Sequence, residues 1–140
     1  MPNVLEDYET IKHLLTPTDR KELNDLRTVI LEVIDLHGLG YGQETYQKLL
    51  LEALKQRNIK FSFPTVVPVK CNGRLVKYYK AKLPTIANNI LCSISVLKKN
   101  PHNDMLKLKT YLRDLNLPFG IFVHFKKSDI IISGVTLRKS

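Results

Sequence analysis

The spacing of the apolar residues changes near the middle of this chain of 140 residues, and that change constrains its fold more than any other feature. Between residues 18 and 57, apolar residues recur every three to four positions, the period of a helix with one buried face. From residue 59 to residue 96, they alternate with polar residues or form short continuous runs, which is typical of strands. We therefore predict an α+β domain in which two helices precede most of the strands.

Turn and capping residues set the limits of the expected elements. Gly38 and Gly40 end the first helix, and Asn72-Gly73 predicts a tight hairpin because both residues tolerate a positive φ. The predicted order is ααβββαββ, with a mixed sheet flanked by the helices. In chain order, we expect helices at residues 18–37 and 43–57, strands at 59–69, 75–83 and 90–96, a helix at 102–115, and strands at 119–125 and 130–137.

The first 17 residues show weak periodicity and end at Thr16-Pro17. We interpret residues 1–17 as an N-terminal arm and residues 18–140 as a single domain. The arm contains apolar side chains but too few for a core of its own. It is therefore expected to dock to a protein partner or, equally, to complete its own domain as a helix.

Positive charge is concentrated in the second half of the chain. The net charge is +9, but residues 1–60 carry eight Lys or Arg and ten Asp or Glu, whereas residues 61–140 carry fourteen and three. No acidic residue occurs between Glu52 and Asp104. Such one-sidedness is typical of a surface that binds a polyanion, most often nucleic acid. A solvated lysine surface that maintains solubility is the alternative.

Several classes of chemistry lack the residues that they need. The four histidines and two cysteines show no metal-ligand spacing, and no nucleophile stands out beside a base. We therefore expect neither a metal nor a cofactor. No apolar run reaches the roughly 20 residues of a membrane span, and the acidic N-terminal segment is unlike a signal peptide. These features predict an intracellular protein without a membrane partner.

Two segments carry a family resemblance. The first is Tyr111-Leu112-Arg113 followed by Leu-Pro-Phe-Gly-Ile-Phe-Val-His-Phe at residues 117–125, and the second joins Asn72-Gly73 to Tyr-Lys-Ala-Lys-Leu at residues 79–83. In this order and at these separations, they resemble the GxxExxY proteins, a branch of the PD-(D/E)XK nuclease superfamily. The resemblance covers about residues 23–137 and implies a PD-(D/E)XK nuclease-like core.

The resemblance also implies where a catalytic site would lie. The family has a Glu on the second helix, an Asp on the second strand, Glu-x-Lys on the third strand and a Gln on the next helix. The matching positions here are Gln43, Lys82, Cys92, Ile94 and Lys107. Glu44 adjoins the first position, but one residue turns a helical side chain by about 100°. Because divalent cations need carboxylate ligands, this set predicts an inactive nuclease.

Lysine at two of these positions has two explanations. Lys82 in place of an Asp could supply the charge that a metal supplies elsewhere, which would leave a pocket that holds a phosphate group without cleaving it. Alternatively, positions that have lost a catalytic role drift, and Lys is tolerated wherever its end reaches water. The stretch without acidic residues favours anion binding.

These observations lead to two functional hypotheses. The first is a pseudonuclease that binds the backbone of nucleic acid without sequence specificity. Few aromatic residues lie near its lysines in the sequence, only Tyr78 and Tyr79, so recognition of single strands is not favoured. The lysines expected to contact phosphates are Lys77, Lys80, Lys82, Lys98, Lys99, Lys107 and Lys109.

The alternative hypothesis is a structural subunit of a large assembly, such as a virus particle. The basic half would then pack on acidic protein, or on nucleic acid held by other subunits, and residues 1–17 would dock to a neighbour. A working nuclease whose acidic residues have migrated is a third possibility.

Overall fold

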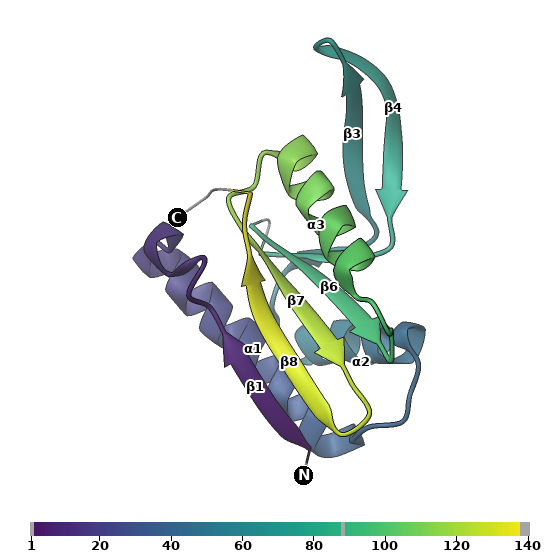
Figure 1. Cartoon of the computed structure of the whole chain (residues 1–140). Coiled ribbons are helices and arrows are strands. Elements are labelled where there is room, and N and C mark those ends of the chain that lie inside the picture. Colours follow the sequence, from purple (N-terminus) through teal and green to yellow (C-terminus); the bar gives the residue numbers. More distant parts are fainter. Residues whose placement is uncertain (1, 88, 138–140) are drawn as a thin grey trace.

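The computed structural model describes residues 2–87 and 89–137, in which a mixed sheet lies between two layers of helix (Figure 1). The strand order of the sheet is β1-β8-β7-β6-β5-β2. β1 pairs with β8 and β6 pairs with β7 in parallel, whereas the remaining pairs are antiparallel. The six strands are β1 (Asn3–Asp7), β2 (Phe61–Ser62), β5 (Thr85–Ile86), β6 (Ile90–Val96), β7 (Gly120–Phe125) and β8 (Asp129–Val135).

Three α-helices cover this sheet within the described residues. The first begins at a capping box, in which the Thr16 hydroxyl accepts from the Asp19 amide and the Asp19 carboxylate accepts from the Thr16 amide, both at 3.1 Å. The helices are α1 (Pro17–His37), α2 (Gln43–Gln56) and α3 (His102–Leu115), and a short 3-10 helix, η1 (Lys12–Leu14), precedes them. Figure 1 shows α1 and α2 behind the sheet and α3 in front of it.

Strand alternation divides the apolar side chains between two cores, because successive residues point to opposite faces of the sheet. Ile90, Cys92 and Ile94 of β6 belong to the cluster that contains the buried residues of α1 and α2. Leu91 lies on the other face, in the cluster formed with Phe122 and the leucines of α3. β6 is therefore buried on both faces, as we expect of a central strand.

Gly120 allows α3 to pack close to the sheet. A Cβ at this position would lie 2.9 Å from the carbonyl oxygen of Leu91, 3.3 Å from Leu108 and 3.4 Å from Leu112. The first distance is shorter than a carbon atom can tolerate against a backbone oxygen. The absence of a side chain at residue 120 thus lets β7 lie against the backbone of β6 and leaves room for the two leucines of α3.

The predicted fold class is confirmed, with a mixed sheet flanked by three helices in an α+β chain. β6 has the predicted limits, and the helices begin and end within one residue of the expected positions. Two strands were not predicted: β1, and the short β5.

The hairpin of β3 (Thr65–Cys71) and β4 (Arg74–Ala81) differs from our expectation, because it forms a separate two-stranded sheet. It projects from the body beside α3 (Figure 1). All residues from Arg74 to Lys80 are exposed, and burial begins only at Ala81. Lysines along β4 keep the strand in water on both faces, which prevents it from joining a sheet covered by helices. The predicted turn is present, with φ of 51° at Asn72 and 80° at Gly73.

The N-terminal segment is also different from the separate arm that we expected over residues 1–17. β1 pairs with β8, and the carboxylate of Glu6 accepts from Arg27 of α1 at 2.6 and 2.9 Å. Ile11 is fully buried, and a Cβ at Gly134 would lie 2.6 Å from its side chain. The segment completes the sheet and the core of the domain, as one of our two expectations allowed, but it does so as a strand and a 3-10 helix and not as an α-helix.

Replacing Ile11 with Ala is expected to lower the free energy of unfolding by about 2–5 kcal/mol, because it leaves a cavity over Gly134. Urea denaturation would measure the change. Leu5→Ala on β1 is the matched control, since Leu5 is half exposed and its loss should have little effect. Equal, small effects of both changes would contradict the packing of this segment.

Candidate functional site

Three adjoining cavities form a groove across the domain. The first, of 550 Å³, lies between α2 and the base of the hairpin. The middle cavity, of 240 Å³, shares Gln43 and Lys82 with it and reaches α3. The third, of 450 Å³, shares Tyr79, Lys107 and Tyr111 with the middle cavity and lies between the hairpin and α3. We refer to these three cavities together as the groove.

The start of α2 is held in place by a buried tyrosine. The Tyr46 hydroxyl donates to the carbonyl of Gly38 at 2.6 Å, and its ring stacks on Phe125 of β7 with centroids 4.0 Å apart. Gly38 has a φ of 67° and ends α1. These contacts fix the loop between the two helices, so that Gln43, the first residue of α2, lies where the first two cavities meet.

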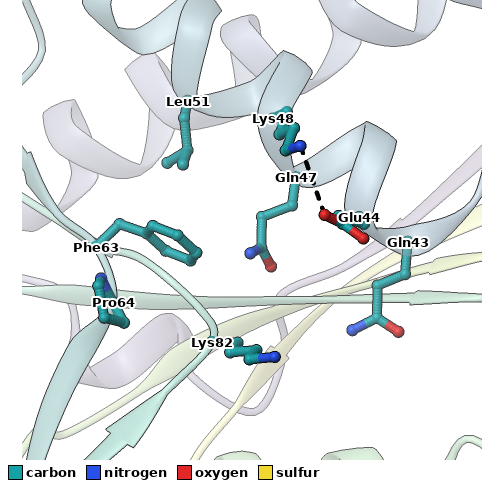
Figure 2. A pocket seen from close by; sticks show the side chains of 8 residues that line it. All are labelled: Gln43, Glu44, Gln47, Lys48, Leu51, Phe63, Pro64 and Lys82. Carbon is teal, nitrogen blue, oxygen red and sulfur yellow. Dashed lines mark ion pairs between the residues drawn. The ribbon is translucent and has the colours of Figure 1, made fainter.

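The base of the hairpin is held by buried hydroxyl groups. Thr65 donates from Oγ1 to the carbonyl of Leu83 at 2.8 Å, and its Oγ1 also lies 2.8 Å from that of Thr85. This network ties together the two chain segments that enter and leave the hairpin. It places Phe63 on one segment and Lys82 on the other, and both line the first cavity (Figure 2).

The residues that β6 presents to the groove differ from those that we predicted. Cys92 and Ile94 are buried in the core beneath α1 and α2, on the face of the sheet away from the groove. Burial raises the pKa of the Cys92 thiol to about 12. Ser93 lines the middle cavity instead. A one-residue shift exchanges the two faces of a strand, so Cys92 and Ile94, which we predicted as site positions, do not line the groove, whereas Ser93 does.

α3 contributes one face to the middle cavity. Asp104, Lys107 and Tyr111 are spaced by three and four residues, which brings them to the same side of the helix. Lys109 lies two residues from Lys107 and does not line the cavity. The Asp104 carboxylate is 3.3 Å from the ammonium group of Lys98, which follows β6.

The structure brings together four of the seven predicted lysines. Lys80, Lys82, Lys98 and Lys107 line the middle cavity. The other three, Lys77, Lys99 and Lys109, line none of the three cavities.

The acidic residues of the groove each lie beside a basic side chain. Glu44 is 3.5 Å from Lys48 and largely exposed, and it lines the first cavity but not the middle one (Figure 2). Asp104 is paired with Lys98 as described, and Asp114 is 3.0 Å from Arg113. Among the described residues, no acidic partner is found for Lys80, Lys82 or Lys107. The middle cavity therefore carries a net positive charge.

This set of side chains does not suit a divalent cation. Mg²⁺ and related ions take oxygen ligands, mainly carboxylates. Within residues 2–87 and 89–137, no group of three or more His, Cys, Asp or Glu side chains is placed to hold a metal ion. Amide, hydroxyl and ammonium groups stand at the middle cavity instead, in Gln43, Ser93 and Lys82.

Three aromatic residues lie along the groove. Phe63 lines the first cavity, and its side chain extends toward Gln47 (Figure 2). Tyr79 and Tyr111 line the second and third, and their rings stack with centroids 6.0 Å apart. Burial and the contact with Tyr79 raise the pKa of Tyr111 to about 12. Neither Phe63 nor Tyr111 was predicted as a site residue. Tyr111 lies at helical spacing from Lys107, whereas no pattern in the sequence marks Phe63.

Two polar side chains lie deeper on the same face of the sheet. Ser95 of β6 and His124 of β7 are register partners and are both buried. Neither the hydroxyl oxygen of Ser95 nor Nε2 of His124 has a hydrogen-bond partner in the described part of the chain. Burial, and then the charge of Lys126, lower the pKa of His124 below its ordinary value of 6.5.

Comparisons with known proteins give one match. The sequence model of the PD-(D/E)XK nuclease superfamily matches residues 20–133, which include every element that forms the groove. No curated protein and no solved structure matches the chain. In the described residues, none of the helices is both long and apolar enough to cross a bilayer.

The buried histidine predicts a loss of stability in mild acid. As the pH falls below the ordinary pKa of 6.5, the unfolded chain takes up a proton at residue 124 before the folded chain does. The free energy of unfolding should therefore decrease toward the lower, folded pKa, and His124→Asn should weaken this dependence. Urea denaturation between about pH 7.5 and 5 measures it, with exposed His102→Asn as control. The same pH dependence in all three proteins would contradict the assignment.

Proposed function

Since the chain belongs to the PD-(D/E)XK nuclease superfamily, we propose that it is a member that binds nucleic acid in the groove without cleaving it. The observation that carries the proposal is the chemistry of the middle cavity. It is lined by Lys82, Ser93 and Lys107, in the region where the family resemblance implies metal-binding carboxylates and a glutamine.

An ammonium or hydroxyl group is suited to a phosphate in a way that a carboxylate is not. Each can donate a hydrogen bond to a phosphate oxygen, and the charge of a lysine balances the negative charge of the phosphodiester. The exposed ends of Lys80, Lys82 and Lys107 require little desolvation to reach a ligand. Gly42 precedes α2 without a side-chain cap, which adds free backbone N–H groups near Gln43.

Recognition of this kind does not depend on the nucleotide sequence. Lysine contacts to phosphates fix the position of a nucleic acid, whereas sequence is read from the base edges. The middle cavity is too small, at 240 Å³, and too rich in lysine to read several base edges at once. We therefore propose binding without sequence specificity.

A second candidate function is supported by the exposed apolar side chains of the hairpin. Val76 and Tyr78 are each 63% exposed, and Val66 and Leu75 are each 47% exposed. An exposed apolar surface of this kind suits contact with another protein. The chain would then be a structural subunit of a larger assembly, docking through the hairpin and not through residues 1–17. In that case, isolated protein should bind nucleic acid weakly at every salt concentration.

Incubation with Mg²⁺ or Mn²⁺ is expected to leave plasmid DNA, linear DNA and RNA intact, because the middle cavity lacks a set of hard oxygen ligands. Gel electrophoresis after prolonged incubation measures this outcome. Nicking that disappears in Lys82→Ala protein would show that the groove performs hydrolysis and would overturn the proposal. Nicking that persists in that variant would indicate a contaminating nuclease.

Binding to nucleic acid is expected to weaken steeply as salt is added, because each neutralised phosphate releases bound counterions. Six phosphate contacts would lower the affinity by roughly a thousandfold between 50 and 200 mM salt. Replacing Lys80, Lys82 and Lys107 together with Ser should reduce the slope of log affinity against log salt by about two to three. Fluorescence anisotropy with a labelled oligonucleotide provides the measurement.

The matched control for this experiment replaces three basic residues away from the groove. Lys12, Arg20 and Lys21 are exposed on η1 and α1, so the triple Ser variant should bind almost as the unchanged protein does. Equal losses in the two triple variants would indicate that net charge, and not the groove, governs binding.

A further inference from the structure

We propose that the ligand of the groove is an unpaired strand of nucleic acid, whose bases stack on Tyr79 and Phe63 while its backbone lies at the middle cavity. This inference rests on the proposed function and specifies its substrate class. It departs from the expectation from sequence, in which too few aromatic residues lay near the lysines to favour single strands.

The chemistry of the groove changes twice along its length. The first cavity has an apolar wall of Leu51, Phe63 and Pro64. The middle cavity is basic, and the third again has an apolar wall, which contains Val67, Val69 and Leu106. An unpaired strand has the same alternation of chemistry, because each charged phosphate is flanked by nucleosides with apolar base faces.

The aromatic side chains stand at the boundaries of the basic cavity. Phe63 is 40% exposed and lines the first cavity together with Lys82. Tyr79 is 43% exposed and lines the middle cavity with the same lysine, as well as the third cavity. The stack with Tyr111 supports one face of the Tyr79 ring and holds its orientation. Phe63 and Tyr79 therefore each present an aromatic ring to a base in a cavity that Lys82 also lines. Stacking of bases on such rings tolerates any sequence.

A duplex makes poor use of this arrangement. Its bases remain stacked in the interior, so it presents phosphates to the lysines and leaves both apolar cavities unfilled. The cavities of 550 and 450 Å³ are of the size that holds a small molecule, or a single nucleoside. Filling them requires bases that are free to leave a stack.

The neighbouring tyrosine supplies a matched control. Tyr78 adjoins Tyr79 on β4, so its side chain points to the opposite face of the hairpin. It pairs in register with Pro68, is 63% exposed and lines none of the three cavities. The two positions thus differ in the face that they occupy, while residue type and strand are the same and both side chains are exposed.

Fluorescence anisotropy with a labelled oligonucleotide of mixed sequence, alone and annealed to its complement, tests the inference at one salt concentration. We expect the single strand to bind at least about tenfold more tightly than the duplex. Tyr79→Ala and Phe63→Ala should each weaken single-strand binding by about tenfold and leave duplex binding almost unchanged. Tyr79→Phe, which keeps the ring, should restore the affinity, and Tyr78→Ala should have no effect. Thermal denaturation checks that each variant is folded.

The possible failures separate the two proposals. Equal binding of single strand and duplex, unaffected by Tyr79→Ala but weakened by the triple Ser variant of the groove lysines, would overturn this inference and leave the proposed function standing. An effect of Tyr78→Ala as large as that of Tyr79→Ala would place binding on the outer face of the hairpin and also overturn it. Absence of binding to either oligonucleotide at low salt would overturn both proposals.

Discussion

The close packing of α3 on the central strands is the contact on which the groove depends. Gly120 of β7 leaves room for the Leu91 carbonyl of β6 and for Leu108 and Leu112 of α3, which pack on it. The helix then brings Lys107 over the strand that carries Ser93, and it offers Tyr111 to the hairpin. A movement of α3 away from the sheet would displace Lys107 and Tyr111 together, because both residues lie on this helix.

Most of the fold follows from local signals in the sequence, and the departures have identifiable causes. The helical stripes and the continuous apolar run at residues 90–96 are strong patterns, so these elements appear where they were expected. β1 was missed because its residues are mostly exposed and its stability comes from distant partners, namely β8 and Arg27. The hairpin was assigned to the main sheet because alternation indicates a strand but not the sheet to which it belongs.

Three of the five predicted site positions line one cavity, whereas the two on β6 do not. Gln43, Lys82 and Lys107 are brought together at one cavity, although 64 residues separate the first from the last. The assignment on β6 failed by a single residue. Cys92 and Ile94 were assigned from the family resemblance, whereas the alternation of Ser93 and Ser95 with apolar residues marks the opposite face of the strand as the polar one.

The pairing of β1 with β8 has a consequence for the order in which the chain acquires its structure. Asn3 lies opposite Asp129, so strands near the two limits of the described chain are neighbours in the sheet. During synthesis, the N-terminal segment leaves the ribosome long before its partner strand exists. Until residues 129–135 have been made, Ile11 has no Gly134 to pack against, and one edge of β7 stays open to other chains. The closing step joins residues far apart in sequence, which makes it intrinsically slow. Nascent chains of this protein are therefore expected to need protection from aggregation until residues 129–135 have been made and have paired.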